Sequence, residues 1–133
     1  MSIVHPTVRY LIVCEDVVTS EQETRNVTIV NLVSTIQPTA GQQYPLRREE
    51  MCVFLQLAEC RGPANGWVEI AFADTEAIVF RTKDRTIPFP TDPLEVCGLT
   101  FRIRNCVSSQ PGLYCVRFVY NEEIIAENPL LLR

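Results

Sequence analysis

Short apolar runs, separated by prolines and turn residues, recur along the whole chain without settling into a helical period. Such runs are typical of β-strands, whereas an amphipathic helix repeats its apolar residues every three or four positions. The 133 residues include nine prolines and five glycines, which suits one β domain with stiff connections. We therefore predict an all-β fold: a single antiparallel β-sandwich over residues 1–133, with about seven to nine strands and an immunoglobulin-like or C2-like architecture. A partly closed barrel is the alternative.

The strand boundaries follow from alternation, β-branched content and turn residues. Leu46–Glu50 is expected to form one helical turn at most, and residues 82–93 carry three prolines and cannot form a central strand. Pro129 is expected to interrupt the chain before an apolar tail. The expected strands are Val8–Cys14, Asn26–Ile36, Met51–Cys60, Trp67–Ala73, Ala77–Arg81, Glu95–Asn105, Tyr114–Tyr120 and Ile124–Glu127.

The charge of the chain is a poor match for nucleic acid. Twelve basic and sixteen acidic residues give a net charge of −4, and Lys83 is the only lysine. Because binding to nucleic acid depends mainly on cations that neutralise phosphates, we predict no nucleic-acid partner. The N-terminal residues have no cationic region followed by an apolar stretch, and no run approaches the length of a membrane span. We expect a soluble cytoplasmic protein with no membrane association.

The six cysteines are expected to be reduced thiols in the core. In a secreted chain an even number of cysteines would suggest disulfides, but a cytoplasmic chain keeps its thiols reduced. Zinc is not expected, because no two cysteines have C-x-x-C spacing and the single histidine, His5, lies on an N-terminal arm. Cys52, Trp67 and Cys115 follow the order of an immunoglobulin domain, but Tyr114 and Cys115 are adjacent and therefore point to opposite faces.

The sequence offers little for catalysis. A cysteine or serine nucleophile needs a nearby base, and no nucleophile-elbow, dinucleotide or P-loop motif occurs. We predict no enzyme activity, no catalytic residues, no metal ligands and no cofactor. The alternative is a ligand-binding, calcium-binding or hydrolytic sandwich that uses loop carboxylates; the scattered candidates are Glu15, Asp16, Asp74, Glu76, Asp84 and Asp92.

Two groups of residues are candidates for an interface. Trp67 alternates away from the apolar face of its strand, and Ile87 and Phe89 project from the proline-bearing segment, which is expected to cap one edge of the sandwich. The second group contains Arg102, Arg104 and Arg117, which are predicted to point outward on neighbouring strands of one face. Solvated arginines with cross-strand partners such as Glu69 or Glu95, and a Trp67 covered from within the chain, are the alternatives.

The run Leu11–Asp16, followed by Asn26–Leu32, resembles the opening of a family of small uncharacterised bacterial proteins. The closing segment from Gly112-Leu113-Tyr114 to Pro129-Leu130 is similar to the last hairpin of that family, although Asn31 stands where the family pattern has glycine. The resemblance implies a free-standing β-sandwich in a bacterial cytoplasm and supplies no activity. Taken together, we predict a non-enzymatic interaction or scaffolding module that binds a protein partner or a second copy of itself.

Overall fold

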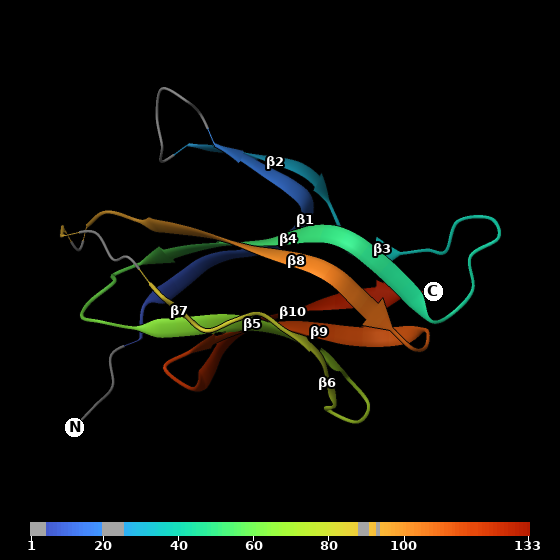
Figure 1. Cartoon of the computed structure of the whole chain (residues 1–133). Coiled ribbons are helices and arrows are strands. Elements are labelled where there is room, and N and C mark those ends of the chain that lie inside the picture. Colours follow the sequence, from blue (N-terminus) through green and yellow to red (C-terminus); the bar gives the residue numbers. More distant parts are fainter. Residues whose placement is uncertain (1–4, 20–25, 88–90, 93) are drawn as a thin grey trace.

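The computed structural model describes residues 5–19, 26–87, 91–92 and 94–133. These residues form ten β-strands and no helix, and two of the strands have only two residues each (Figure 1). No helix long and apolar enough to span a membrane occurs in this part of the chain. The strands are β1 (Thr7–Thr19), β2 (Val27–Leu32), β3 (Thr35–Ile36), β4 (Leu46–Ala58), β5 (Asn65–Phe72), β6 (Ile78–Arg81), β7 (Arg85–Thr86), β8 (Cys97–Ser108), β9 (Gly112–Tyr120) and β10 (Glu123–Leu132).

The strands form two packed sheets, which confirms the predicted β-sandwich. The first sheet has the order β2-β1-β4-β8, and the second has the order β3-β10-β9-β5-β6 with β7 beside β5. Every pairing is antiparallel except that of the short β3 with β10. In Figure 1 the free ends of β1 and β2 extend as a ribbon away from the two layers.

The core lies between the sheets and follows the predicted alternation. In β8, the side chains of Leu99, Phe101 and Ile103 are buried and those of Arg102 and Arg104 are exposed. In β9 the inward residues include Tyr114, whose hydroxyl donates a hydrogen bond to the Gln110 carbonyl oxygen at 2.7 Å. This contact resembles the tyrosine corner of β-sandwiches and fastens the start of β9 to the preceding turn.

The cysteines are all free, as predicted, but they are not all in the main core. Cys14 and Cys52 are Cα partners across β1 and β4, and they form a small separate cluster with Val17 and Phe54. Cys115 on β9 is only half-buried. An immunoglobulin-type bridge between Cys52 and Cys115 does not form. The remaining cysteines, Cys60, Cys97 and Cys106, lie in the main core.

Several predicted boundaries differ from the structure; for example, the strand predicted over Val8–Cys14 is β1 (Thr7–Thr19). Leu46–Glu50 is part of β4 and not a helical turn, because it continues the ladder with β8, where Leu46 opposes Ser108. The strand predicted over Asn26–Ile36 breaks after Leu32, where Asn31 has a φ of 50° and the chain crosses from the first sheet to the second. Asparagine tolerates this left-handed conformation better than most residues that have a Cβ atom.

Pro129 does not interrupt β10, which runs to Leu132. The Ala73 amide donates to the Leu113 carbonyl oxygen, so Leu113 and Cys115 direct their backbone groups toward β5. Pro129 opposes Cys115, and its nitrogen therefore points away from β9. The parallel pairing with β3 begins only at Leu131. No ladder hydrogen bond needs an N–H at Pro129, so the strand continues.

Two glycines test the packing between the sheets. A Cβ atom at Gly66 would lie 2.9 Å from both the Phe118 ring and the Val119 carbonyl oxygen, whereas one at Gly98 would meet only Phe54, at 3.5 Å. We expect Gly66→Ala to lower the free energy of unfolding by about 1–3 kcal/mol, because the backbone oxygen must move. Gly98→Ala is expected to change it by less than about 1 kcal/mol. Urea titrations of the two variants measure the difference, and equal midpoints would contradict the packing described.

Candidate functional site

The backbone of β8 forms an open edge of the first sheet. Every second residue of an antiparallel strand directs both its N–H and its C=O to the same side. The Val33 amide donates to the Val13 carbonyl oxygen at 2.8 Å. The backbone N–H and C=O of Val13 therefore point toward the β2 side, and those of its neighbour Cys14 point toward β4. Cys14 opposes Cys52, so the backbone N–H and C=O of Cys52 point toward β1 and not toward β8. Arg102, the partner of Cys52 on β8, then directs its backbone groups away from the sheet.

A second contact leads to the same assignment. The Arg85 side chain of β7 donates a hydrogen bond to the Thr100 carbonyl oxygen at 2.8 Å, which requires this oxygen to point outward. Arg102 and Arg104 follow at the same two-residue spacing and face the same side. Within the part of the chain that the structure describes, no strand pairs with β8 at this edge. The N–H and C=O groups of Arg102 and Arg104 are therefore available for another extended chain.

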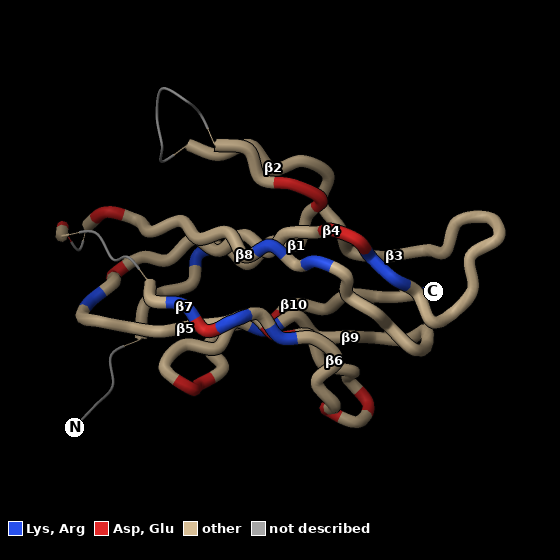
Figure 2. Tube along the Cα trace, in the orientation of Figure 1, with Lys and Arg blue, Asp and Glu red and all other residues tan. Residues whose placement is uncertain are grey.

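Basic residues surround this edge. Figure 2 shows basic segments on β8 and, across from them, on the chain that joins β6 and β7. The two segments lie close together, since Arg85 bonds to Thr100 and its guanidinium lies 4.9 Å from the centre of the Phe101 ring. Arg102 and Arg104 lie on the edge strand itself, and Arg85 contacts it. Lys83 lies two residues before Arg85 in the chain that joins β6 and β7.

Arg102 is held in place by acidic neighbours on the outer face of the first sheet. Its guanidinium donates to an Asp16 carboxylate oxygen at 3.0 Å, lies 3.6 Å from Glu50, and contacts the Cys52 sulfur at 3.3 Å. The hydrogen bond from Arg102 holds the pKa of the Asp16 carboxyl below its ordinary value of 3.8, and the Val17 amide adds to this effect. Burial raises the pKa of the neighbouring Cys14 thiol to about 11, so this thiol is protonated at neutral pH.

The three candidate arginines do not share one face. Arg102 and Arg104 lie on β8 of the first sheet, and Arg117 lies on β9 of the second. Alternation along a strand predicts which residues share a face, but it does not say which of two sheets a strand joins. Arg117 is also buried, with 7% of its surface exposed, and is therefore part of a different site.

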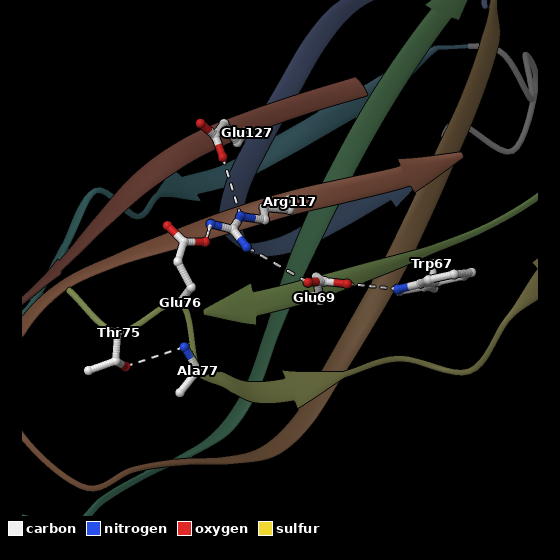
Figure 3. Close-up of polar contacts among 7 residues, drawn as sticks. All are labelled: Trp67, Glu69, Thr75, Glu76, Ala77, Arg117 and Glu127. Carbon is white, nitrogen blue, oxygen red and sulfur yellow. Dashed lines mark hydrogen bonds and ion pairs between the residues drawn. The ribbon is translucent and has the colours of Figure 1, made fainter. Parts of the chain in front are cut away.

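Arg117 belongs to a row of alternating charge on the outer face of the second sheet. The row crosses β10, β9, β5 and β6 through the successive Cα partners Glu127, Arg117, Glu69 and Arg81. Arg117 donates to Glu127 at 3.3 Å and lies 4.0 Å from Glu69 (Figure 3). It also donates to Glu76 from the β5–β6 turn. The bond to Glu76 raises the pKa of the Arg117 guanidinium, and Glu127 adds to this effect.

Trp67 lies beside this row and is covered from within the chain. Its indole N–H donates to a Glu69 carboxylate oxygen at 3.0 Å (Figure 3), and the Arg81 guanidinium lies 3.9 Å from the ring centre. Cover from within the chain is the alternative that the sequence suggested for Trp67, and Arg81 provides it. Glu69 is the cross-strand partner of Arg117, as the sequence suggested. Trp67 is left half-buried.

The remaining interface candidates are Ile87 and Phe89. Ile87 is 3% exposed and packs in the core, so it does not present its side chain to a partner. Phe89 lies outside the described residues. His5 is not on a loose arm: it pairs with Glu123 at 2.9 Å and packs edge-on against Tyr120.

The loop carboxylates do not converge. Asp16 is bonded to Arg102, Glu15 to Asn31 and Glu76 to Arg117, and Asp92 accepts a hydrogen bond from the Leu94 amide, so four of the six calcium candidates have protein partners. Among the described residues, no group of three or more histidine, cysteine or acidic side chains is placed to hold a metal ion. The described residues therefore show no carboxylate cluster suited to calcium, and the open backbone edge of β8 remains as the candidate site.

Comparisons with known proteins bear on the fold alone. No family model and no curated protein matches the sequence. Among solved structures, the chain is similar to the alkylpurine DNA glycosylase AlkC of Pseudomonas fluorescens bound to DNA containing an abasic site analog. The TM-score is 0.55 at 14% sequence identity, and the match covers 96% of this chain and 30% of the glycosylase chain. The chain thus spans less than a third of that protein, and at this identity the likeness concerns the fold only.

The charge row predicts a stability effect. Arg117→Met leaves Glu69, which is 6% exposed, without its cation. Because the described residues place no further layer over this face, we expect a loss of about 2 kcal/mol, below the 3–5 kcal/mol typical of a deeply buried pair. Arg61→Met, at an exposed loop position, is the control and is expected to change stability by less than about 0.5 kcal/mol. If urea titration gives both variants the same midpoint, the row contributes nothing to stability.

The Asp16–Arg102 pair predicts a pH dependence. Because the pKa of Asp16 is lowered in the folded state, its stabilising effect is complete above the ordinary value of 3.8 and is lost as the pH falls through the folded-state pKa. The melting temperature of Asp16→Asn is therefore expected to lie below that of the wild type at pH 6 and to approach it toward pH 3. Asp74→Asn, an exposed turn position, is the control. A constant offset between wild type and Asp16→Asn over this range would contradict the assigned pair.

Proposed function

We propose that this protein is a non-enzymatic interaction module that binds an extended segment of a protein partner by adding it as a strand to β8. One observation carries the proposal: β8 has 12 residues and lies at the edge of its sheet, with the backbone groups of Arg102 and Arg104 directed outward. Long open edges are rare in proteins that do not use them, because they invite pairing with other chains. In strand addition the main-chain hydrogen bonds supply affinity and the flanking side chains supply specificity.

The other edges are poorer templates. In the second sheet β3 has two residues and β6 has four. The two-residue β7 pairs with β5, as β6 does. Strand β2, at the far edge of the first sheet, has six residues and carries the left-handed Asn31 near its end. Strand β2 also has no basic residue, whereas Arg102 and Arg104, the outward residues of the regular β8 edge, are both basic.

Several observations favour this class of function over catalysis or nucleic-acid binding. The carboxylates of the charge row are bonded to Arg117 or to the Trp67 indole, which leaves them poorly suited to proton transfer. The net charge of −4 disfavours a polyanion, and the DNA bound to the similar glycosylase is a property of that protein. The six free cysteines support a reducing compartment, and we infer a bacterial cytoplasmic setting from them together with the family resemblance.

The test uses proline at an outward position. Arg104→Pro removes an N–H that faces the open edge and leaves the ladder with β4 intact, whereas Arg104→Ala keeps this N–H and removes only the side chain. The probes are three fluorescein-labelled peptides of about nine residues in which valine alternates with threonine, glutamate or lysine. We expect at least one peptide to bind in fluorescence anisotropy, and Arg104→Pro to weaken that binding by about tenfold or more, as lost main-chain hydrogen bonds require.

Circular dichroism and the melting temperature establish that each variant is folded. Arg104→Ala is expected to bind that peptide more tightly than Arg104→Pro does. The proposal fails if none of the three peptides binds at millimolar concentration, or if folded Arg104→Pro binds as tightly as the wild type.

A further inference from the structure

The charges at the β8 edge indicate which extended segments it accepts, provided that the proposed strand addition is correct. A strand paired with β8 would place side chains opposite Arg102 and Arg104 on the outer face of the first sheet, two residues apart along the partner. Directly opposed side chains in neighbouring strands lie close enough for their charges to matter. The side chain that a partner carries at these two positions therefore meets a guanidinium.

Arg104 has a charge that the fold leaves unused. Its Cα partner on β4 is Glu50, but the Glu50 carboxylate lies 3.6 Å from the guanidinium of Arg102. Within the described residues, Arg104 makes no ion pair. Lys83, on the opposite side of the edge, is exposed and likewise has no ion pair in the described part of the chain. Arg102 already contacts Asp16 and Glu50, so Arg104 and Lys83 are the main sources of uncompensated positive charge.

The length of the site is limited at both ends. At one end the Thr100 carbonyl oxygen already accepts a hydrogen bond from the Arg85 side chain. At the other, Asn105 has a φ of 57° and accepts two hydrogen bonds from Arg47, so the regular edge ends there. The strand β6 lies near β8 without pairing with it, and its partly buried Val79 and Phe80 provide an apolar floor between the sheets. The open stretch between Thr100 and Arg104 has room for a short partner segment. Two of its side chains would lie opposite Arg102 and Arg104, and the apolar side chain between them would point toward the other sheet.

A second copy of this chain fits the edge poorly. If two β8 strands paired antiparallel about Ile103, each Arg102 would oppose an Arg104 of the other copy, and like charges directly opposed are destabilising. The same arginines that repel a second copy attract carboxylates, so the edge discriminates between partners by charge.

We propose that the β8 edge binds a short extended segment of a protein partner with carboxylates at two alternate positions and an apolar residue between them. The carboxylates lie opposite Arg102 and Arg104, of which Arg104 has the charge that no described residue pairs, and Val79 and Phe80 contact the apolar residue. This occupant is an acidic peptide segment; single-stranded nucleic acid and a second copy of the chain are competing outcomes of the experiment.

The experiment ranks the three alternating peptides and adds a single-stranded DNA oligonucleotide of similar length. We expect the glutamate peptide to bind about tenfold more tightly than the threonine peptide in 50 mM NaCl, with the lysine peptide weakest, as two favourable cross-strand charge pairs imply. The ratio should shrink in 500 mM NaCl, because exposed charges are screened. Arg104→Gln should reduce the ratio of glutamate to threonine affinity to about three, and Arg61→Gln, at a distant exposed loop position, should leave it at about ten.

The outcomes separate the two proposals. If all three peptides bind equally and Arg104→Pro still abolishes binding, strand addition stands and acidic selectivity is wrong. If no peptide binds, strand addition fails and the selectivity fails with it. If the DNA oligonucleotide binds more tightly than the glutamate peptide and Arg104→Gln weakens it, the edge recognises phosphates instead. Concentration-dependent dimerisation that Arg104→Pro abolishes would likewise overturn the assignment, in favour of a second copy.

Discussion

The pairing of β4 with β1 on one side and β8 on the other determines what the first sheet offers to its surroundings. Because the backbone direction alternates strictly along each strand, the register Cys14–Cys52–Arg102 fixes which β8 residues bond to β4 and which face outward. The inward Phe101 and Ile103 are secured by both packing and hydrogen bonds. The outward Arg102 and Arg104 combine positive charge with backbone groups that no described strand pairs, and the proposed function rests on this combination.

The second sheet buries charged side chains on its outer face. Its outer face carries Arg117 and Glu69, which are almost fully covered although the described residues place no further layer there. Burying such groups is costly unless each is paired. Cross-strand register supplies the partners Glu127 and Arg81, the β5–β6 turn brings Glu76, and Trp67 donates to Glu69 while stacking under Arg81. The charges of this face thus have partners, whereas at the β8 edge Arg104 makes no ion pair with any described residue.

Much of the fold could be predicted from the sequence, because alternation is a local property. The faces of β8 and β9 and the all-β class follow from it. What the sequence missed depends on long-range contacts: Leu46–Glu50 is strand because β8 continues beside it, and Pro129 is tolerated because its nitrogen happens to face away from β9. The pairing of Glu69 with Arg117 was within reach of the sequence. The stacking of Arg81 on Trp67, and the separation of Arg117 from Arg102 and Arg104, required knowledge of the sheet order.

The backbone direction of β8 can be measured in the protein alone by amide hydrogen exchange. The account predicts that the Arg102 and Arg104 amides, which face outward, exchange with solvent much faster than those of Phe101 and Ile103, which bond to β4. A pattern of fast, slow, fast over residues 102, 103 and 104 would support the open edge. Equal protection at all three residues, or protection at the arginines with rapid exchange at Ile103, would contradict it and remove the basis for strand addition.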